Sequence, residues 1–336
     1  MPRECGIRHD RYRRAARRPH SPARRVRAHA LHSRRLASGH AGSAPARSDA
    51  RAGACRRFTA FDRLRGRPSP ADRSSRILCP GGARGNRKNG VNVPRERVGR
   101  AFAAAPDYDG NARVQREVAL ALAARIAALD LPENPRVLEI GCGTGFLTQA
   151  LDGLGGDWLV TDLSPAMLER CRARIGESAG YRYAALDGEY GQPEEGPFDL
   201  ICSSLAVQWF DHAPAALRRL ARWLAPGGHL MVTTLGPGSF AEWRAAHEAE
   251  GLAPGTPRFA SVADFGDLLH GVENHVEHHP SPLAFLHALK AIGAQTAEAD
   301  HRPLSPGRLR RVMARFAQSG CNVTYEVVTC HLHRTN

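Results

Sequence analysis

A glycine-rich stretch, Val137 to Gly145 (VLEIGCGTG), constrains this chain more than any other part of the sequence. Residues typical of a strand run into a loop with glycine at every second position, 141, 143 and 145, and residues 146–151 then read as a helix. A strand that opens through glycines onto a helix N-terminus brings backbone N–H groups close to a ligand. A dinucleotide-binding loop needs G-x-G-x-x-G, and Phe146 stands where its third glycine would be.

The pattern E-x-G-x-G-x-G over residues 139–145 resembles the first motif of the class I S-adenosylmethionine-dependent methyltransferases. The resemblance implies that S-adenosylmethionine binds here as methyl donor. It also implies that the motif contributes the first set of cofactor-binding residues, namely Glu139, Gly141, Cys142, Gly143 and Gly145.

A second strand, residues 157–162, is predicted to end in an acid, Asp162, 17 residues past Gly145. In doubly wound folds an acid at about this distance accepts hydrogen bonds from ribose hydroxyls. The alternative is a turn or cap residue, but Ser164-Pro165 is the better helix start and leaves Asp162 free for the ligand. Leu163 and Met167, which follow it, are also assigned to the cofactor site.

A third strand, residues 181–186, precedes Asp187-Gly188. In the resembled superfamily an acid here receives the adenine amino group, which implies cofactor roles for Asp187 and Gly188; the alternative is a simple turn, since Asp-Gly favours one. A fourth strand, residues 198–204, places Ser203 at its carboxyl end, where open α/β sheets bind ligands.

Strands and amphipathic helices therefore alternate, and a fifth strand is predicted over 229–235. We expect an α/β fold: a Rossmann-like, doubly wound, mostly parallel seven-stranded sheet with an antiparallel C-terminal strand and a small helical cap. The remaining elements are predicted as helices over 112–129, 282–292 and 306–316 and strands over 272–278 and 323–332. Residues 101–109 are either a lid over the cofactor or, as the pattern alone favours, an ordinary packing segment.

The net charge of +14 comes from the first 90 residues, which hold 24 of the 47 Lys and Arg but 5 of the 33 Asp and Glu. This leader lacks apolar periodicity, so residues 1–92 are expected to be disordered, and residues 93–336 to form the methyltransferase domain with an N-terminal lid segment and a C-terminal substrate-side insertion. Three interpretations of the leader are open: a nucleic-acid-binding arm, a transit peptide, or sequence that is not part of the mature protein. We favour the last, with translation beginning near Val91 or Val93.

The eight cysteines are scattered without C-x-x-C, which favours reduced thiols in a cytoplasmic protein. No apolar run is long enough to span a membrane, so no membrane partner is expected. The spacing of His275, His278 and His279 matches no standard zinc site, and no metal is expected.

Several more particular segments resemble the malonyl-acyl carrier protein O-methyltransferases of biotin synthesis, from about Arg97 to His333. They are FAAAPDYD within 102–115, SSLAVQWF at 203–210, TTL…SFAEW within 233–243, LKAIGA at 289–294 and VTYEV at 323–327. The resemblance implies methylation of the free carboxylate of a malonyl thioester, on acyl carrier protein or coenzyme A, as the first step toward pimelate.

This reaction needs no general base, because a carboxylic acid is already ionised at neutral pH. A buried carboxylate does need a cation or several donors, for which Arg244 and Lys290 are the candidates. Tyr108, Gln208 and Trp209 are expected to shape the substrate pocket. Two arginine-bearing helices, with Arg308, Arg310, Arg311 and Arg315 in one and Arg218, Arg219 and Arg222 in the other, are either docking sites for an acidic carrier or solvated faces.

Two other functions stay open from the sequence. One is a methyltransferase for another small carboxylate, such as an aconitate-like acid, which the glycine motif permits. The other is an RNA-binding protein that uses the basic leader; the acidic remainder of the chain argues against it, and no nucleic-acid partner is expected.

Overall fold

Seven strands form one mixed sheet in the computed structural model, which describes residues 95–105, 107–176, 180–294 and 301–335. The order of the strands is β3-β2-β1-β4-β5-β7-β6. β7 is antiparallel to both of its neighbours, and the other adjacent pairs are parallel. The strands are β1 (Arg136–Ile140), β2 (Asp157–Asp162), β3 (Tyr181–Ala185), β4 (Phe198–Ser204), β5 (Leu224–Leu235), β6 (Leu269–His278) and β7 (Asn322–His333). The predicted fold class is confirmed.

Two strands, β5 and β6, begin several residues earlier than predicted. β5 starts at Leu224 rather than His229, because the Pro226-Gly227-Gly228 sequence forms an irregularity within the strand. Its register against β4 shifts there, from the pair Phe198 and Leu224 to the pair Leu200 and His229. β6 likewise starts at Leu269, with a register shift against β7 before Gly271.

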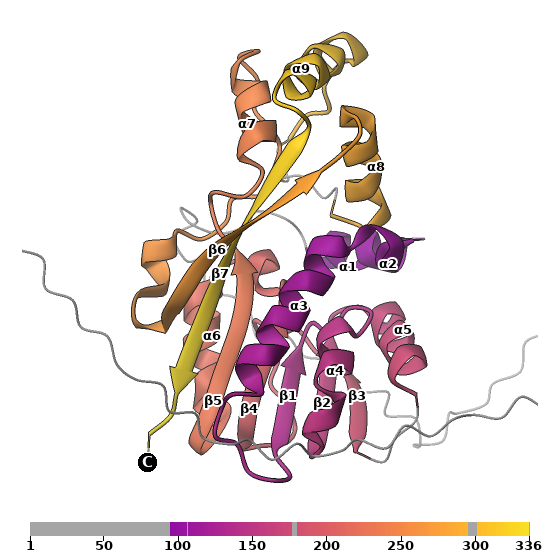
Figure 1. The fold of residues 1–336 in the computed structure, drawn as a ribbon. Coiled ribbons are helices and arrows are strands. Elements are labelled where there is room, and N and C mark those ends of the chain that lie inside the picture. The colour runs from indigo at the N-terminus through magenta and orange to yellow at the C-terminus, as the bar shows by residue number, and fades with distance from the viewer. Residues whose placement is uncertain (1–94, 106, 177–179, 295–300, 336) are drawn as a thin grey trace, which may run out of the picture. The chain divides into compact units, whose positions relative to one another are not determined.

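Helices cover both faces of the sheet (Figure 1). α3 (Arg113–Ile126), α4 (Phe146–Ala150) and α5 (Pro165–Ile175) pack on one face around Val137, Trp158 and Leu200. α6 (Ala213–Leu220) and the 3-10 segment η4 (Val262–Leu268) cover the other face around Leu138 and Ile201. Adjacent residues such as Val137 and Leu138 face opposite sides of a strand, so a sheet covered on both faces requires continuously apolar strands. The remaining short segments are η1 (Asp152–Leu154), η2 (Val207–Trp209) and η3 (Ala221–Trp223).

A helical cap stands beyond the carboxyl ends of the parallel strands (Figure 1). It consists of α7 (Ala241–Glu248), α8 (Pro282–Ala291) and α9 (Pro306–Gln318). Trp243, Phe285 and Phe316, one from each helix, meet with ring centroids 5.3–5.4 Å apart. α1 (Arg95–Ala103) and α2 (Tyr108–Asn111) lie at the same end of the sheet. The cap and the N-terminal helices therefore enclose the sheet edge where open α/β folds bind ligands.

The five described cysteines, Cys142, Cys171, Cys202, Cys321 and Cys330, are buried and free. Each of the three histidines considered for zinc has a different neighbour: His275 lies 4.0 Å from Glu117, His278 faces Asn322, and His279 packs on Phe285. None of the helices in the described part of the chain has the length and apolar character needed to cross a bilayer. The predictions about residues 1–92 fall outside the described residues.

Candidate functional site

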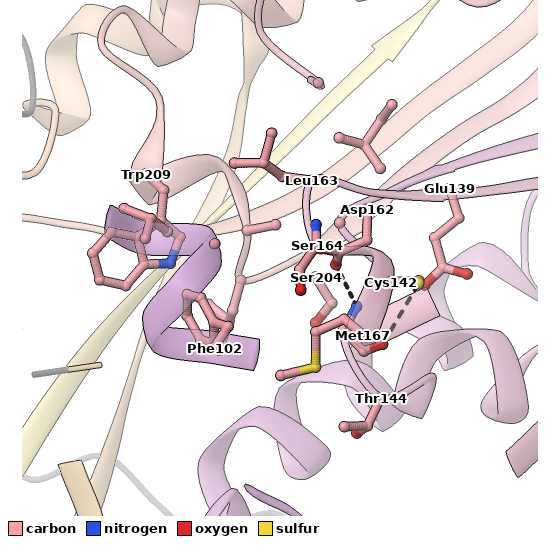
Figure 2. Close-up of a pocket in the computed structure, with 18 of the residues that line it drawn as sticks. Phe102, Glu139, Cys142, Thr144, Asp162, Leu163, Ser164, Met167, Ser204 and Trp209 are labelled. Carbon is pink, nitrogen blue, oxygen red and sulfur yellow. Dashed lines mark hydrogen bonds between the residues drawn. The ribbon is translucent and has the colours of Figure 1, made fainter. Parts of the chain in front are cut away.

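A pocket opens at the carboxyl ends of β1, β2, β3 and β4 (Figure 2). Nine of the eleven residues that the sequence assigned to the cofactor line it: Glu139, Gly141, Cys142, Gly143, Asp162, Leu163, Met167, Asp187 and Gly188. Strand, loop and helix starts from three consecutive βα units thus converge on one space. We call this space the cofactor pocket.

The glycine loop needs its glycines for two different reasons. Gly141 has φ +68°, and a Cβ there would lie 2.4 Å from the Cβ of Ala206, so the loop passes too close to β4's continuation for any side chain. Gly145, with φ +88°, does not line the pocket; a Cβ there would lie 2.8 Å from the Sγ of Cys171. Gly145 therefore allows α4 to begin close against α5.

Asp162 ends β2 and points into the pocket (Figure 2). Its Oδ2 accepts a hydrogen bond of 2.9 Å from Gly143 N, and its Oδ1 accepts one of 2.8 Å from Ser164 N. Asp162 therefore also forms the turn that was the alternative interpretation, and Ser164 is the N-cap and Pro165 the first residue of α5 as predicted. Each carboxylate oxygen has a second lone pair, so the group can still accept from ribose hydroxyls.

Glu139 is buried at the end of β1, where its Oε2 accepts a 2.7 Å hydrogen bond from the Thr148 hydroxyl. Burial raises the pKa of this carboxyl to about 8, and the neighbouring Cys171 adds to the effect. The group is therefore largely protonated at neutral pH when no ligand is bound. A cation beside it would favour the ionised form.

The raised pKa of Glu139 predicts a pH dependence of stability. Because the folded state binds the Glu139 proton up to about pH 8 and the unfolded chain releases it near pH 4.5, this group's contribution is lost as pH rises through that window. Glu139→Gln should therefore gain melting temperature relative to wild type as pH rises from about 6 to 9. Thermal unfolding of both ligand-free proteins across that range measures it; a pH-independent difference would contradict the assignment.

Asp187 follows β3 and holds two kinds of partner. Its Oδ1 accepts from the backbone N–H groups of Glu189 and Tyr190, at 2.9 and 3.1 Å, which is the turn that Asp-Gly favours. Its Oδ2 accepts a 2.5 Å hydrogen bond from Arg95. Asp187 thus forms the turn that was the alternative interpretation, and its side chain also lies on the pocket wall.

The N-terminal helices form one wall of the cofactor pocket, which the sequence pattern alone did not favour. Arg95, Val98, Gly99 and Phe102 of α1 line the pocket. Arg95 anchors α1 through ion pairs with three carboxylates and lies 4.1 Å above the Tyr190 ring; the carboxylates are Asp187, Glu189 and Asp211. The FAAAPDYD segment at residues 102–109 singled out this part of the chain in the sequence. It did not reveal the ion pairs that attach α1 to the rest of the domain.

Two further contacts fasten this wall to the glycine loop and to α5. Asp109 of α2 accepts a 2.7 Å hydrogen bond from the Thr144 hydroxyl and pairs with Arg174. Arg170 of α5 donates to the carbonyl of Ala105 at 2.9 Å. The wall is therefore attached to the elements that it covers at both α1 and α2.

Ser204, rather than the predicted Ser203, faces the cofactor pocket. Consecutive residues of a strand point to opposite sides, so a placement that is wrong by one residue reverses the side chain. Ser203 is fully buried and donates to the carbonyl of Ile140 on the neighbouring strand at 2.7 Å. The Ser204 hydroxyl is buried and has no hydrogen-bond partner among the described residues.

A second cavity, which we call the apolar chamber, continues from the cofactor pocket toward the cap. The two share Phe102, Tyr108, Gln115, Leu205 and Trp209. Phe102 and Trp209 pack edge to face 5.6 Å apart at this junction (Figure 2). Gln208 also lines the chamber, so all three residues predicted to shape the substrate pocket lie here. No charged side chain is found among the described residues that line it.

Two non-glycine residues of the chamber, Leu205 and Phe240, have left-handed backbone conformations, with φ of +49° and +60°. Each such residue costs about 1 kcal/mol or more, and strain of this kind is concentrated at functional sites. Both backbones are held by hydrogen bonds, from Leu205 N to Thr233 O and from Phe240 N to Thr324 O. The chamber is thus shaped by β5 and β7 as well as by its own side chains.

The two predicted cations lie outside both cavities. Lys290 is exposed on α8, although the preceding residue, Leu289, lines the chamber. Arg244 of α7 lines a third cavity together with Arg258 and His301, and its guanidinium donates to the carbonyls of Pro237 and Ser239. The fold therefore places neither Arg244 nor Lys290 in the cofactor pocket or in the apolar chamber, where a substrate carboxylate could meet the cofactor.

Comparison with known proteins places this architecture in a family. A model described as a methyltransferase domain matches residues 138–230. A malonyl-[acyl-carrier protein] O-methyltransferase of Magnetococcus marinus is 41% identical over 244 residues, which are 69% of this chain and 90% of that protein. The chain belongs to the malonyl-[acyl-carrier protein] O-methyltransferase family. As a member of this family it is an S-adenosylmethionine-dependent methyltransferase.

A second relative of this chain is the biotin biosynthesis bifunctional protein BioCD of Bordetella avium. It is 48% identical over 241 residues, 70% of this chain, and the chain spans about half (51%) of its length. Among solved structures, the N-methyltransferase NodS of Bradyrhizobium japonicum in complex with S-adenosyl-L-homocysteine is 18% identical, with 72% of this chain and 98% of that chain covered and a TM-score of 0.42.

Proposed function

We propose that this enzyme transfers a methyl group from S-adenosylmethionine to the free carboxylate of a malonyl thioester, and that the thioester is carried on acyl carrier protein or coenzyme A. The malonyl-[acyl-carrier protein] O-methyltransferase relatives supply the substrate class. The observation that carries the proposal is an uncharged chamber that opens directly into a pocket with the features of a nucleoside site. The product ester would serve biotin synthesis.

The cofactor pocket fits S-adenosylmethionine by its donor and acceptor set. Asp162 offers oxygens to ribose hydroxyls, Asp187 to an adenine amino group, and Glu139 to the methionine ammonium. The buried hydroxyl of Ser204 has no partner among the described residues and is available to a ligand that fills the pocket. When bound, S-adenosylmethionine supplies an electrophilic methyl group on a positively charged sulfur.

The substrate carboxylate is proposed to bind at the junction of the two cavities, between Tyr108 and Gln115. Neither the Tyr108 hydroxyl nor the Gln115 amide has a hydrogen-bond partner among the described residues, and both line the junction. Burial raises the pKa of Tyr108, and the nearby Asp162 adds to it, so the hydroxyl remains a donor. Two neutral donors then replace the cation that the sequence led us to expect.

The walls of the junction exclude water and orient the substrate carboxylate. Phe102 and Trp209 cover the junction, and a carboxylate without its hydration shell is a better nucleophile. Holding the carboxylate oxygen at near-attack distance supplies the main rate advantage, since no proton has to be removed. No residue is therefore assigned as a general base.

A cytoplasmic location belongs to the same proposal, and the five free, buried cysteines of the described chain are consistent with a reducing compartment. The location would also give the enzyme access to soluble acyl carriers.

The test is methyl transfer by the full chain with isotopically labelled S-adenosylmethionine and a panel of thioesters. Malonyl, succinyl and acetyl groups on acyl carrier protein, together with free aconitate, form the panel. Base-labile label is expected on the malonyl carrier, little on the succinyl carrier, and none on the acetyl carrier, which has no free carboxylate. Labelling of aconitate in preference to malonyl thioesters would overturn the proposed substrate.

A further inference from the structure

Two cysteine thiols that methyl transfer does not need meet where the glycine loop packs on α5. Cys142 lies in the loop and lines the cofactor pocket (Figure 2). Cys171 lies on α5 and is fully buried. Gly145 N donates a 2.9 Å hydrogen bond to the Cys142 carbonyl, and a Cβ on Gly145 would lie 2.8 Å from the Sγ of Cys171. Both cysteines therefore contact the same residue of the loop.

The side chains of Cys142 and Cys171 are also hydrogen-bonded to each other. This thiol–thiol bond lowers the pKa of Cys171, and the Thr148 hydroxyl, 3.5 Å from its Sγ, and the charge of Arg174 add to the effect. The same bond, together with burial, raises the pKa of Cys142. The thiolate is the nucleophilic form of a cysteine, so Cys171 is the better nucleophile of the pair.

A covalent bond between these two sulfurs would displace the glycine loop. The S–S bond of a disulfide is about 2.05 Å long, so two hydrogen-bonded sulfurs have to approach each other by roughly 1 Å or more to form it. Cys171 already packs against Gly145, so the movement falls on the part of the loop around Cys142. The next residue, Gly143, donates its N–H to Asp162 at 2.9 Å, and that contact would be disturbed too.

We propose that Cys142 and Cys171 form a reversible disulfide that inactivates the cofactor pocket of the ligand-free enzyme when a peroxide enters it. The O–O bond of the peroxide breaks as one oxygen is transferred to Cys142, which gives a sulfenic acid and one water. The Cys171 sulfur then attacks the Cys142 sulfur. The S–S bond forms, the S–O bond breaks, and the hydroxyl leaves with the Cys171 proton as a second water. Two thiols thus lose two electrons and two protons to one hydrogen peroxide.

This inference goes beyond the proposed function, because it concerns the cofactor pocket and is independent of which carboxylate is methylated. It also links oxidation to cofactor binding, since S-adenosylmethionine in the pocket would cover Cys142. At a cofactor concentration 100 times the dissociation constant, only about 1% of the protein has an empty pocket. Disulfide formation should then be about 100-fold slower than in the ligand-free enzyme.

The test begins with hydrogen peroxide treatment of the full chain, with and without S-adenosylmethionine. Peptide mass mapping without reduction should find a peptide pair linked through Cys142 and Cys171; mapping is needed because the chain has eight cysteines. Calorimetric titration should show a dissociation constant for S-adenosylmethionine that is roughly 10- to 100-fold higher after oxidation, as expected when binding groups move by about 1 Å. Dithiothreitol should restore the affinity. Oxidation of Met167 in the same pocket would not be reversed, because a methionine sulfoxide requires its own reductase.

Cys171→Ala and Cys171→Ser should bind the cofactor as untreated wild type does and should keep that affinity after peroxide. The serine variant retains a hydroxyl beside Thr148 in case the alanine variant folds poorly. Cys202→Ala is the matched control, because Cys202 is also fully buried in the same core cluster, on β4, and this variant should lose affinity as wild type does.

Three results would each overturn the inference: no peptide pair linked through Cys142 and Cys171, a linked enzyme with unchanged cofactor affinity, or a loss of affinity that persists in both Cys171 variants. Equal rates of linkage with and without S-adenosylmethionine would overturn it as well. Failure of the untreated enzyme to bind S-adenosylmethionine at all would remove the cofactor pocket and this inference together.

Discussion

Replacing Gly143 with alanine is expected to raise the dissociation constant for S-adenosylmethionine by about 100-fold and to leave the fold intact. Gly143 lines the cofactor pocket, and a Cβ built on it meets no protein atom within 4 Å. The added methyl group would therefore project into space that the ligand needs. Its φ of +55° adds a strain of about 1–2 kcal/mol, which lowers the melting temperature by a few degrees.

Gly227→Ala provides the matched control. Gly227 has φ +77° and equally open surroundings, but it lies in the irregular part of β5 and lines none of the three cavities. Both variants should lose similar melting temperature, and Gly143→Ala alone should lose the cofactor. Calorimetric titration with S-adenosylmethionine and with S-adenosylhomocysteine makes the comparison. Equal affinities in the two variants would remove the glycine loop from the site.

Local patterns in the sequence were sufficient to predict most of the residues that meet in the cofactor pocket. The glycine spacing and the acids Asp162 and Asp187 each depend on one strand and the loop that follows it. In a parallel sheet the carboxyl ends of such strands lie at one edge, so positions along the chain translate directly into neighbours in space. Gly145 and Ser203 were misplaced because a loop or strand residue can face the adjoining helix or sheet as easily as the ligand.

The substrate side could not be predicted in the same way, because its residues come from elements that are distant in the sequence. Gln115 on α3, Leu205 after β4 and Tyr325 on β7 line one chamber only after the cap has folded over the sheet. Charge alone suggested Arg244 and Lys290 for the carboxylate, but neither reaches the junction. The anchoring of α1 through Arg95 could not be predicted from the sequence either, because the three carboxylate partners of Arg95 lie more than 90 residues further along the chain.

For the proposed function, the absence of a cation among the described residues that line the apolar chamber would affect specificity. A fixed arginine beside the methyl group would bind any small carboxylate tightly, including carboxylates other than the malonyl group. Neutral donors hold an anion less strongly, and the positively charged sulfur of the methyl donor then supplies much of the attraction. Once the methyl group has been transferred, both charges have disappeared, so an uncharged chamber favours release of a neutral ester.

Tyr108→Phe is therefore expected to lower kcat/KM for the malonyl substrate by about 10- to 100-fold and to change the affinity for S-adenosylmethionine by less than about threefold. The variant keeps the ring that packs near Phe102 and Phe146 and removes only the unpaired hydroxyl at the junction. Tyr181→Phe is the control, because its hydroxyl donates to Asp152 on the outer edge of the sheet. Steady-state kinetics with calorimetric titration of the cofactor separates the two effects. Equal losses in cofactor binding and turnover would mean that Tyr108 supports the pocket wall instead of the substrate carboxylate.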